Sequence, residues 1–148
     1  MPNYKSATEA TWAAWLNAAG IEFKYEALES ATARALRYQP DFWLPGAVAW
    51  LEIKAVGHVP TPGEERVALD LAKVDNAVVY IACGWPQATD LRLYQFCPSG
   101  SRNEWQGWQA INQLSLLLDK RPALLEVASA AVMGRRREFV ARWEVNRG

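Results

Sequence analysis

Residues 38–54 read YQPDFWLPGAVAWLEIK, a pattern that predicts two β-strands joined by a tight turn. Pro45 presets the φ angle that the second residue of a turn needs, and Gly46 supplies the positive φ of the third residue in a type II turn. The apolar and aromatic residues on either side are typical of strands. We therefore expect an antiparallel hairpin that turns at residues 44–47.

Charged side chains gather on one side of this expected hairpin. The predicted turn places Asp41 opposite Trp50, and because strand side chains alternate, Glu52 and Lys54 point to that same side. Asp41 and Glu52 become diagonal neighbours, roughly 7–8 Å apart at the backbone. A divalent cation with oxygen ligands at about 2.1 Å can bridge that gap. A plain ion pair with Lys54 would leave one carboxylate without a partner, which is costly on an apolar hairpin, so the pattern favours a metal.

The chain has the composition of one folded domain. Its 148 residues are 51% hydrophobic, and the formal net charge is +0, so no global field attracts nucleic acid. Cys83 and Cys97 with a single His cannot form the usual four-ligand zinc site, and both are expected to be reduced core thiols. No signal peptide or membrane-spanning apolar run is recognised, which predicts a soluble, cytoplasmic protein with no membrane partner.

Hydrophobic periodicity predicts an α/β order along the chain. Strands are expected over residues 21–28, in the hairpin 36–54, and over 77–83 and 91–96, the last at a sheet edge. Helices are expected over residues 6–19, from 61, over 108–120 and over 123–145, with a polar loop over 98–107. The predicted fold is a single α/β domain with a mixed central sheet of about five strands flanked by helices. Residues 1–97 would form its core, and residues 98–148 a C-terminal helical extension of the same domain.

Two of these helices begin with the pattern of a capping box. Ser6 is followed three residues later by Glu9, and Thr61 by Glu64. Glu9 also lies at the edge of the buried stripe of its helix. It either only caps that helix or also leans over the hairpin as a third acidic group, and the spacing allows both. Glu64 is expected on the solvated face of its helix.

The hairpin resembles the signature of the PD-(D/E)XK nuclease superfamily. Pro40-Asp41, followed after a short hairpin by Glu52-Ile53-Lys54, is similar to that motif with the ExK form of its second half. A helix with Glu9 and a strand ahead of the hairpin further resemble the small phage-type and Holliday-junction-resolvase-like endonucleases of the superfamily. The resemblance covers about residues 4–83 and implies a restriction-endonuclease-like core.

The resemblance also implies roles for individual residues. Asp41, Glu52 and the carbonyl of Ile53 would hold Mg²⁺ (or Mn²⁺), and Glu9 would reach the ion directly or through water. Lys54, beside the metal, would orient the attacking water or offset charge on the phosphate. These residues would make the protein a Mg²⁺-dependent phosphodiesterase.

Other candidates have an ordinary structural interpretation as well. Glu26 either joins the acidic cluster or lies on a solvated strand face. His58, in the loop after the hairpin, is either a surface residue or contacts phosphate or transfers a proton. A basic cluster in the last predicted helix is either a solvated helix end or a contact for the DNA backbone. It consists of Arg135, Arg136, Arg137 and Arg142.

The expected function is that of an endonuclease acting on DNA. The sequence contains no separate recognition module, which favours structure-selective or weakly sequence-specific cleavage. One small catalytic domain cuts one strand, so double-strand cleavage predicts a homodimer or higher homo-oligomer. A phage origin in a bacterial host rests on the resemblance alone. The alternatives are a catalytically inactive nucleic-acid-binding or assembly protein on a nuclease-like fold, and a nuclease acting on RNA.

Overall fold

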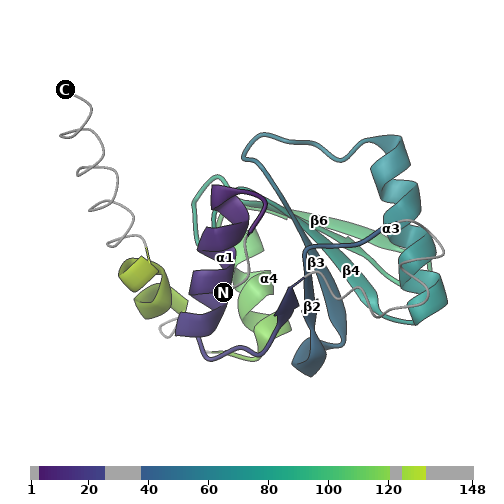
Figure 1. Cartoon of the computed structure of the whole chain (residues 1–148). Coiled ribbons are helices and arrows are strands. Elements are labelled where there is room, and N and C mark those ends of the chain that lie inside the picture. Colours follow the sequence, from purple (N-terminus) through teal and green to yellow (C-terminus); the bar gives the residue numbers. More distant parts are fainter. Residues whose placement is uncertain (1–3, 26–37, 121–124, 133–148) are drawn as a thin grey trace.

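The chain folds into a mixed β-sheet with helices on both faces (Figure 1). The structure is a computed structural model that describes residues 4–25, 38–120 and 125–132. The strands in this part of the chain are β1 (Lys24–Tyr25), β2 (Phe42–Leu44), β3 (Ala49–Lys54), β4 (Val78–Cys83), β5 (Arg92–Phe96) and β6 (Arg102–Gln106). The helices are α1 (Ala7–Ala18), the 3₁₀-helix η1 (Pro45–Ala47), α3 (Pro62–Asp75) and α4 (Trp108–Leu118). Residues 125–132 are also helical.

The six described strands follow the chain order β1-β2-β3-β4-β5-β6 across the sheet. Neighbouring strands are antiparallel except β3 and β4, which are parallel and are joined by α3, because parallel neighbours require a crossover connection. The predicted α/β class with a mixed sheet is confirmed. The expected loop over 98–107 is wrong, since β6 lies there, and β5 is therefore not at the edge.

Two hydrophobic layers lie on opposite faces of the sheet. One contains side chains of α1, α4 and residues 125–132 against Leu51, Leu93 and their neighbours, and the other contains side chains of α3 against Trp50, Ile81 and their neighbours. Figure 1 shows α1 and α4 together on one side of the sheet and α3 on the other. The residues after 98 thus contribute a strand and two helical segments to the same fold as the core.

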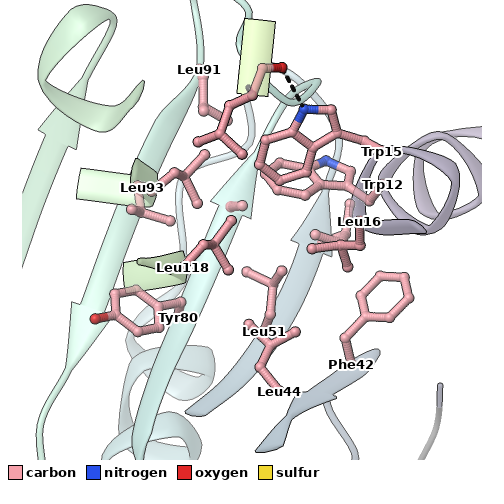
Figure 2. Close-up of a cluster of buried hydrophobic side chains, with 14 of the residues drawn as sticks. Trp12, Trp15, Leu16, Phe42, Leu44, Leu51, Tyr80, Leu91, Leu93 and Leu118 are labelled. Carbon is pink, nitrogen blue, oxygen red and sulfur yellow. Dashed lines mark hydrogen bonds between the residues drawn. The ribbon is translucent and has the colours of Figure 1, made fainter. Parts of the chain in front are cut away.

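Two tryptophans of α1 connect distant segments in the first layer. Trp12 Nε1 donates to the carbonyl of Gly84 at 2.9 Å, and Trp15 Nε1 donates to the carbonyl of Leu125 at 3.3 Å. Both side chains are fully buried, and their rings meet edge to face with centroids 5.4 Å apart (Figure 2). Because a buried indole N–H needs an acceptor, these bonds fix α1 against the residue after β4 and against the helical segment 125–132.

The hairpin turn differs from the prediction. Residues Pro45–Ala47 form a 3₁₀ turn, and the left-handed residue is Val48, with φ 49°; Gly46 does not have a positive φ. The turn is therefore longer, and Trp50 pairs with Trp43 rather than with Asp41. A shift of two residues keeps every side chain on its expected face, whereas a shift of one would reverse them.

No helix within the described ranges combines the length and the apolar character that crossing a membrane requires.

Candidate active site

The carboxyl groups of Asp41 and Glu52 lie together on the sheet face that α3 covers. The register of Phe42 with Leu51, continued by one residue, aligns the two acids directly rather than diagonally as expected. Their side chains share a hydrogen bond, and only 5% of Asp41 and 9% of Glu52 is exposed. The expected proximity of the two acids is therefore present, at closer range than the sequence indicated.

The backbone of Ile53 contacts this cluster. The carbonyl of Lys54 accepts from the N–H of Gly84 at 3.0 Å, so Lys54 faces β4, and the N–H and carbonyl of Ile53 face β2. The same register places Pro40 opposite Ile53, and proline has no N–H to donate. The Ile53 N–H instead donates to Asp41 Oδ2 at 2.7 Å. The Ile53 backbone thus holds the Asp41 carboxylate against β3.

Burial makes it difficult to ionise both acids. Desolvation, followed by the hydrogen bond and the charge of Glu52, raises the pKa of Asp41 to about 9. The pKa of Glu52 is also raised by desolvation, although Asp41, Lys54 and Tyr38 oppose that shift. The raised pKa values therefore favour a proton shared between the two carboxyl groups. Two buried acids that resist ionising together need a partner for their charge before both can be deprotonated.

Lys54 lies beside the acid pair, and its ammonium group is attracted by the carboxylates of Glu52 and Glu64. It is the i+2 neighbour of Glu52 on β3, and its Nζ is 3.4 Å from Oε2 of Glu64 at the start of α3. Desolvation lowers the pKa of Lys54, but the charges of Glu52 and Glu64 outweigh it and raise the pKa above its usual value. Lys54 is therefore a cation at neutral pH.

A pocket of about 500 Å³ opens beside these groups. It is lined by Tyr38, Glu52, Lys54, Thr61, Gly63, Glu64, Val67 and Ile81. Its walls thus include the strand that carries the acid and the amine, together with the first turn of α3. This is the described cavity into which a phosphate beside Lys54 would fit.

Sequence reasoning missed two residues of the site. Tyr38 forms a side-chain hydrogen bond with Glu52, and its pKa is raised by burial and by that carboxylate. Glu64 was assigned to a solvated face, yet it contacts Lys54 and its Oε1 lies 3.0 Å from Nε2 of His58. The capping box predicted at Thr61 is present, and it was the one signal that the Glu64 side chain points back toward the loop after β3.

Glu9 lies near the pair but faces a different partner. It is 7% exposed, and its charge contributes to the raised pKa of Asp41 and of Glu52. Its Oε2 accepts from the hydroxyl of Tyr25 at 2.5 Å and from the N–H of Lys5 at 3.2 Å. The predicted capping box is thus only half formed, because Ser6 Oγ accepts from the Glu9 N–H while the carboxylate bonds to Lys5.

No three His, Cys, Asp or Glu side chains among the described residues converge closely enough to hold a metal ion. Asp41, Glu52, the Ile53 carbonyl and Glu9, the last directly or through water, therefore stay predictions as metal ligands. His58 is partly exposed and contacts Glu64, and its contact with phosphate or role in proton transfer stays a prediction. The remaining candidates lie outside the described residues and stay predictions. They are Glu26, Arg135, Arg136, Arg137 and Arg142.

Comparisons with protein-family models, with curated proteins and with solved structures found no match. The resemblance to PD-(D/E)XK nucleases therefore stays a prediction from the residues themselves. Its test is chemical.

Proposed function

We propose that this protein is a divalent-metal-dependent endonuclease of the PD-(D/E)XK type that hydrolyses phosphodiester bonds in DNA. One observation carries the proposal. The buried carboxyl groups of Asp41 and Glu52 share a hydrogen bond, and Lys54 lies on the same face of β3, at the edge of an open pocket. This is the arrangement that metal-assisted phosphoryl transfer needs, with acidic ligands and a cation around one point.

A purely structural role explains this cluster less well. Buried ionic groups seldom add stability over well-packed apolar residues, and here two buried acids have only one nearby ammonium group in the described part of the chain. That ammonium is also shared with Glu64. The acids therefore cost stability in the metal-free protein, which is expected where a site is built for a ligand rather than for folding.

The donors fit Mg²⁺ or Mn²⁺, which prefer oxygen ligands. Asp41, Glu52 and the Ile53 carbonyl would hold the ion, with Glu9 reaching it through water. When bound, the ion supplies a water of lowered pKa and polarises the phosphate.

The protein's own side chains complete the chemistry. Lys54, fixed as a cation, would donate a hydrogen bond to a phosphate oxygen and offset the charge that develops there. Its raised pKa favours this role over that of a general base. Tyr38 would hold Glu52 in position through their shared hydrogen bond.

The proposed substrate is DNA that is recognised by shape or by a short sequence. The described chain forms one sheet with its helices and includes no further domain that could read a long site. Two copies of the chain would be needed to cut both strands, so the proposal includes a homodimer or larger homo-oligomer.

The test compares wild type with Asp41→Asn and Lys54→Ala on labelled linear, flap, four-way and single-stranded DNA and on RNA. Asp70→Asn is the matched control, because it removes an exposed carboxylate of α3. We expect cleavage by wild type and the control in Mg²⁺ or Mn²⁺, none in EDTA, and a loss of at least about a hundredfold in the two site variants. Equal rates in all four proteins would refute the site. Binding of Mn²⁺ without cleavage would indicate the inactive binding protein, and preferred cleavage of RNA would indicate the other alternative.

A further inference from the structure

We infer that Glu64 is a positioning residue that holds the ammonium group of Lys54 away from Glu52, an inference that rests on the proposed function. The geometry gives Glu64 a role that a cap alone does not require. Its carboxylate closes the far side of the pocket that contains Lys54 and Glu52.

The Glu64 carboxylate is held in place from several directions. Its Oε1 accepts from the N–H of Thr61 at 3.0 Å, while the Glu64 N–H donates to Thr61 Oγ1 at 3.1 Å. The Nε2 of His58 lies 3.0 Å from Oε1 and 3.3 Å from Oε2. A carboxylate anchored to both a helix cap and a loop has lost its rotational freedom before Lys54 arrives. It can therefore orient Lys54 at little further entropic cost.

The position of Lys54 between two acids gives this anchor a consequence for the site. Lys54 and Glu52 point to one side of the same strand, and the charge of Glu52 attracts the ammonium group. Without Glu64, Lys54 would relax onto Glu52 and compete with a cation for that carboxylate. With Glu64 at 3.4 Å from Nζ, the ammonium group is drawn toward the pocket, where a phosphate would lie.

The positioning role and the charge of Glu64 predict different results when Glu64 is removed. Glu64 is an anion beside the place where a polyanion would bind, and removing it should by charge alone tighten DNA binding. If Glu64 positions Lys54, its removal should instead slow cleavage. The two contributions separate when kcat and KM are measured individually.

The experiment uses Glu64→Gln in the full chain. Glutamine can also complete a capping box, so the helix start is kept while the charge is lost. The matched control is Glu65→Gln, which removes the neighbouring acid in the same helical turn, where it pairs with Arg102 outside the pocket. We expect Glu64→Gln to lower kcat by about tenfold, the lower end for residues that orient an active group, with KM unchanged or reduced. Glu65→Gln should retain the wild-type kcat.

A double-mutant cycle with Lys54→Ala, followed under single-turnover conditions, isolates the coupling. If Glu64 acts through Lys54, adding Glu64→Gln to Lys54→Ala should cause no further loss. An equal loss in both backgrounds, or a kcat for Glu64→Gln at or above that of wild type, would overturn the inference.

The contact itself is tested without substrate by the ¹⁵Nζ signal of Lys54 in NMR. The signal should be protected from exchange in the wild type and lost in Glu64→Gln, and its persistence in the variant would overturn the inference even in an active enzyme. If the wild type cleaves nothing while the signal behaves as expected, the proposed function fails and the contact stands.

Discussion

Replacement of Asp41 by asparagine tests the buried acid pair without any substrate. The amide oxygen of Asn can accept from the Ile53 N–H, which lies 2.7 Å from Asp41 Oδ2, and its NH₂ can donate to Glu52. The shape and the hydrogen bonds are thus kept, and one ionisable group is removed. We expect the metal-free variant to be more stable than the wild type at neutral and alkaline pH.

The magnitude follows from the proton that Asp41 binds. Burial and the neighbouring Glu52 raise its pKa from 3.8 to about 9, so between these values the folded protein keeps a proton that the unfolded chain has released. In that window stability decreases as pH rises, by up to about 1.4 kcal/mol per pH unit. From about pH 5 to pH 8 the loss reaches up to about 4 kcal/mol, or roughly 10 °C in Tm for a chain of this size.

Glu64, which lines the pocket, has a pKa shift of the opposite sign that acts in another range of pH. Desolvation opposes the shift of Glu64, but the Thr61 N–H and His58 lower its pKa from 4.5 to about 2. Its contribution is therefore fully present above 4.5 and is lost only as pH falls toward 2. It does not affect the window in which Asp41 acts.

The assay is thermal unfolding in EDTA between about pH 5 and pH 8, for wild type, Asp41→Asn and the exposed-carboxylate control Asp70→Asn. The wild type and the control should lose stability together as pH rises, and Asp41→Asn should show a smaller slope. Parallel slopes for wild type and Asp41→Asn, or a variant less stable than wild type at about pH 8, would refute the raised pKa and the reasoning on the metal site.

Three further predictions concern the site and the core. Mn²⁺ should raise the Tm of the wild type, by the equivalent of about 2.7 kcal/mol when its concentration is a hundred times Kd, and should raise the Tm of Glu52→Gln only slightly. Calorimetry gives Kd, and equal gains in Tm for both proteins would contradict Glu52 as a metal ligand. Tyr38→Phe, which removes the hydroxyl bonded to Glu52, should weaken Mn²⁺ binding by about tenfold in the same titration. Trp12→Phe leaves the buried carbonyl of Gly84 without its donor and should lower the free energy of unfolding in urea by about 1–3 kcal/mol; a smaller change would mean that water replaces the indole.

The face shared by Asp41, Glu52 and Lys54 could be predicted because it depends on strand alternation and on whether the register is odd or even, not on the exact pairing. The turn itself could not. Local rules assign positive φ to glycine, but in this protein Val48 adopts it with φ 49°, a conformation that local propensity disfavours and the surrounding structure must maintain. The prediction of the face survived because the error in register was an even number of residues.

Strand β6 was not predicted because its sequence carries no periodic hydrophobic signal. Within Arg102–Gln106 only Trp105 is partly buried, and the other side chains are exposed. An edge strand of this kind is specified by its pairing with β5, which is information distant in the sequence. Composition alone therefore assigns such a segment to a loop.

The contacts of Tyr38 and Glu64 were also beyond the reach of local reasoning. The contact of Tyr38 depends on the path of the irregular segment before β2. The contact of Glu64 depends on the path of the loop between β3 and α3. The capping box at Thr61 predicted the orientation of the Glu64 side chain relative to its own helix. It could not predict that β3 ends with Lys54 at 3.4 Å from that carboxylate.

One residue that carries no charge links the fold of the hairpin to its chemistry. Pro40 lies opposite Ile53 when the register of β2 with β3 is continued, and because it lacks an N–H it cannot donate to the Ile53 carbonyl there. The Ile53 N–H, on the same side of β3, donates to the side chain of Asp41, which holds one carboxylate at the end of the ladder. The interruption of the ladder therefore coincides with a carboxylate held against the backbone of β3, next to Glu52.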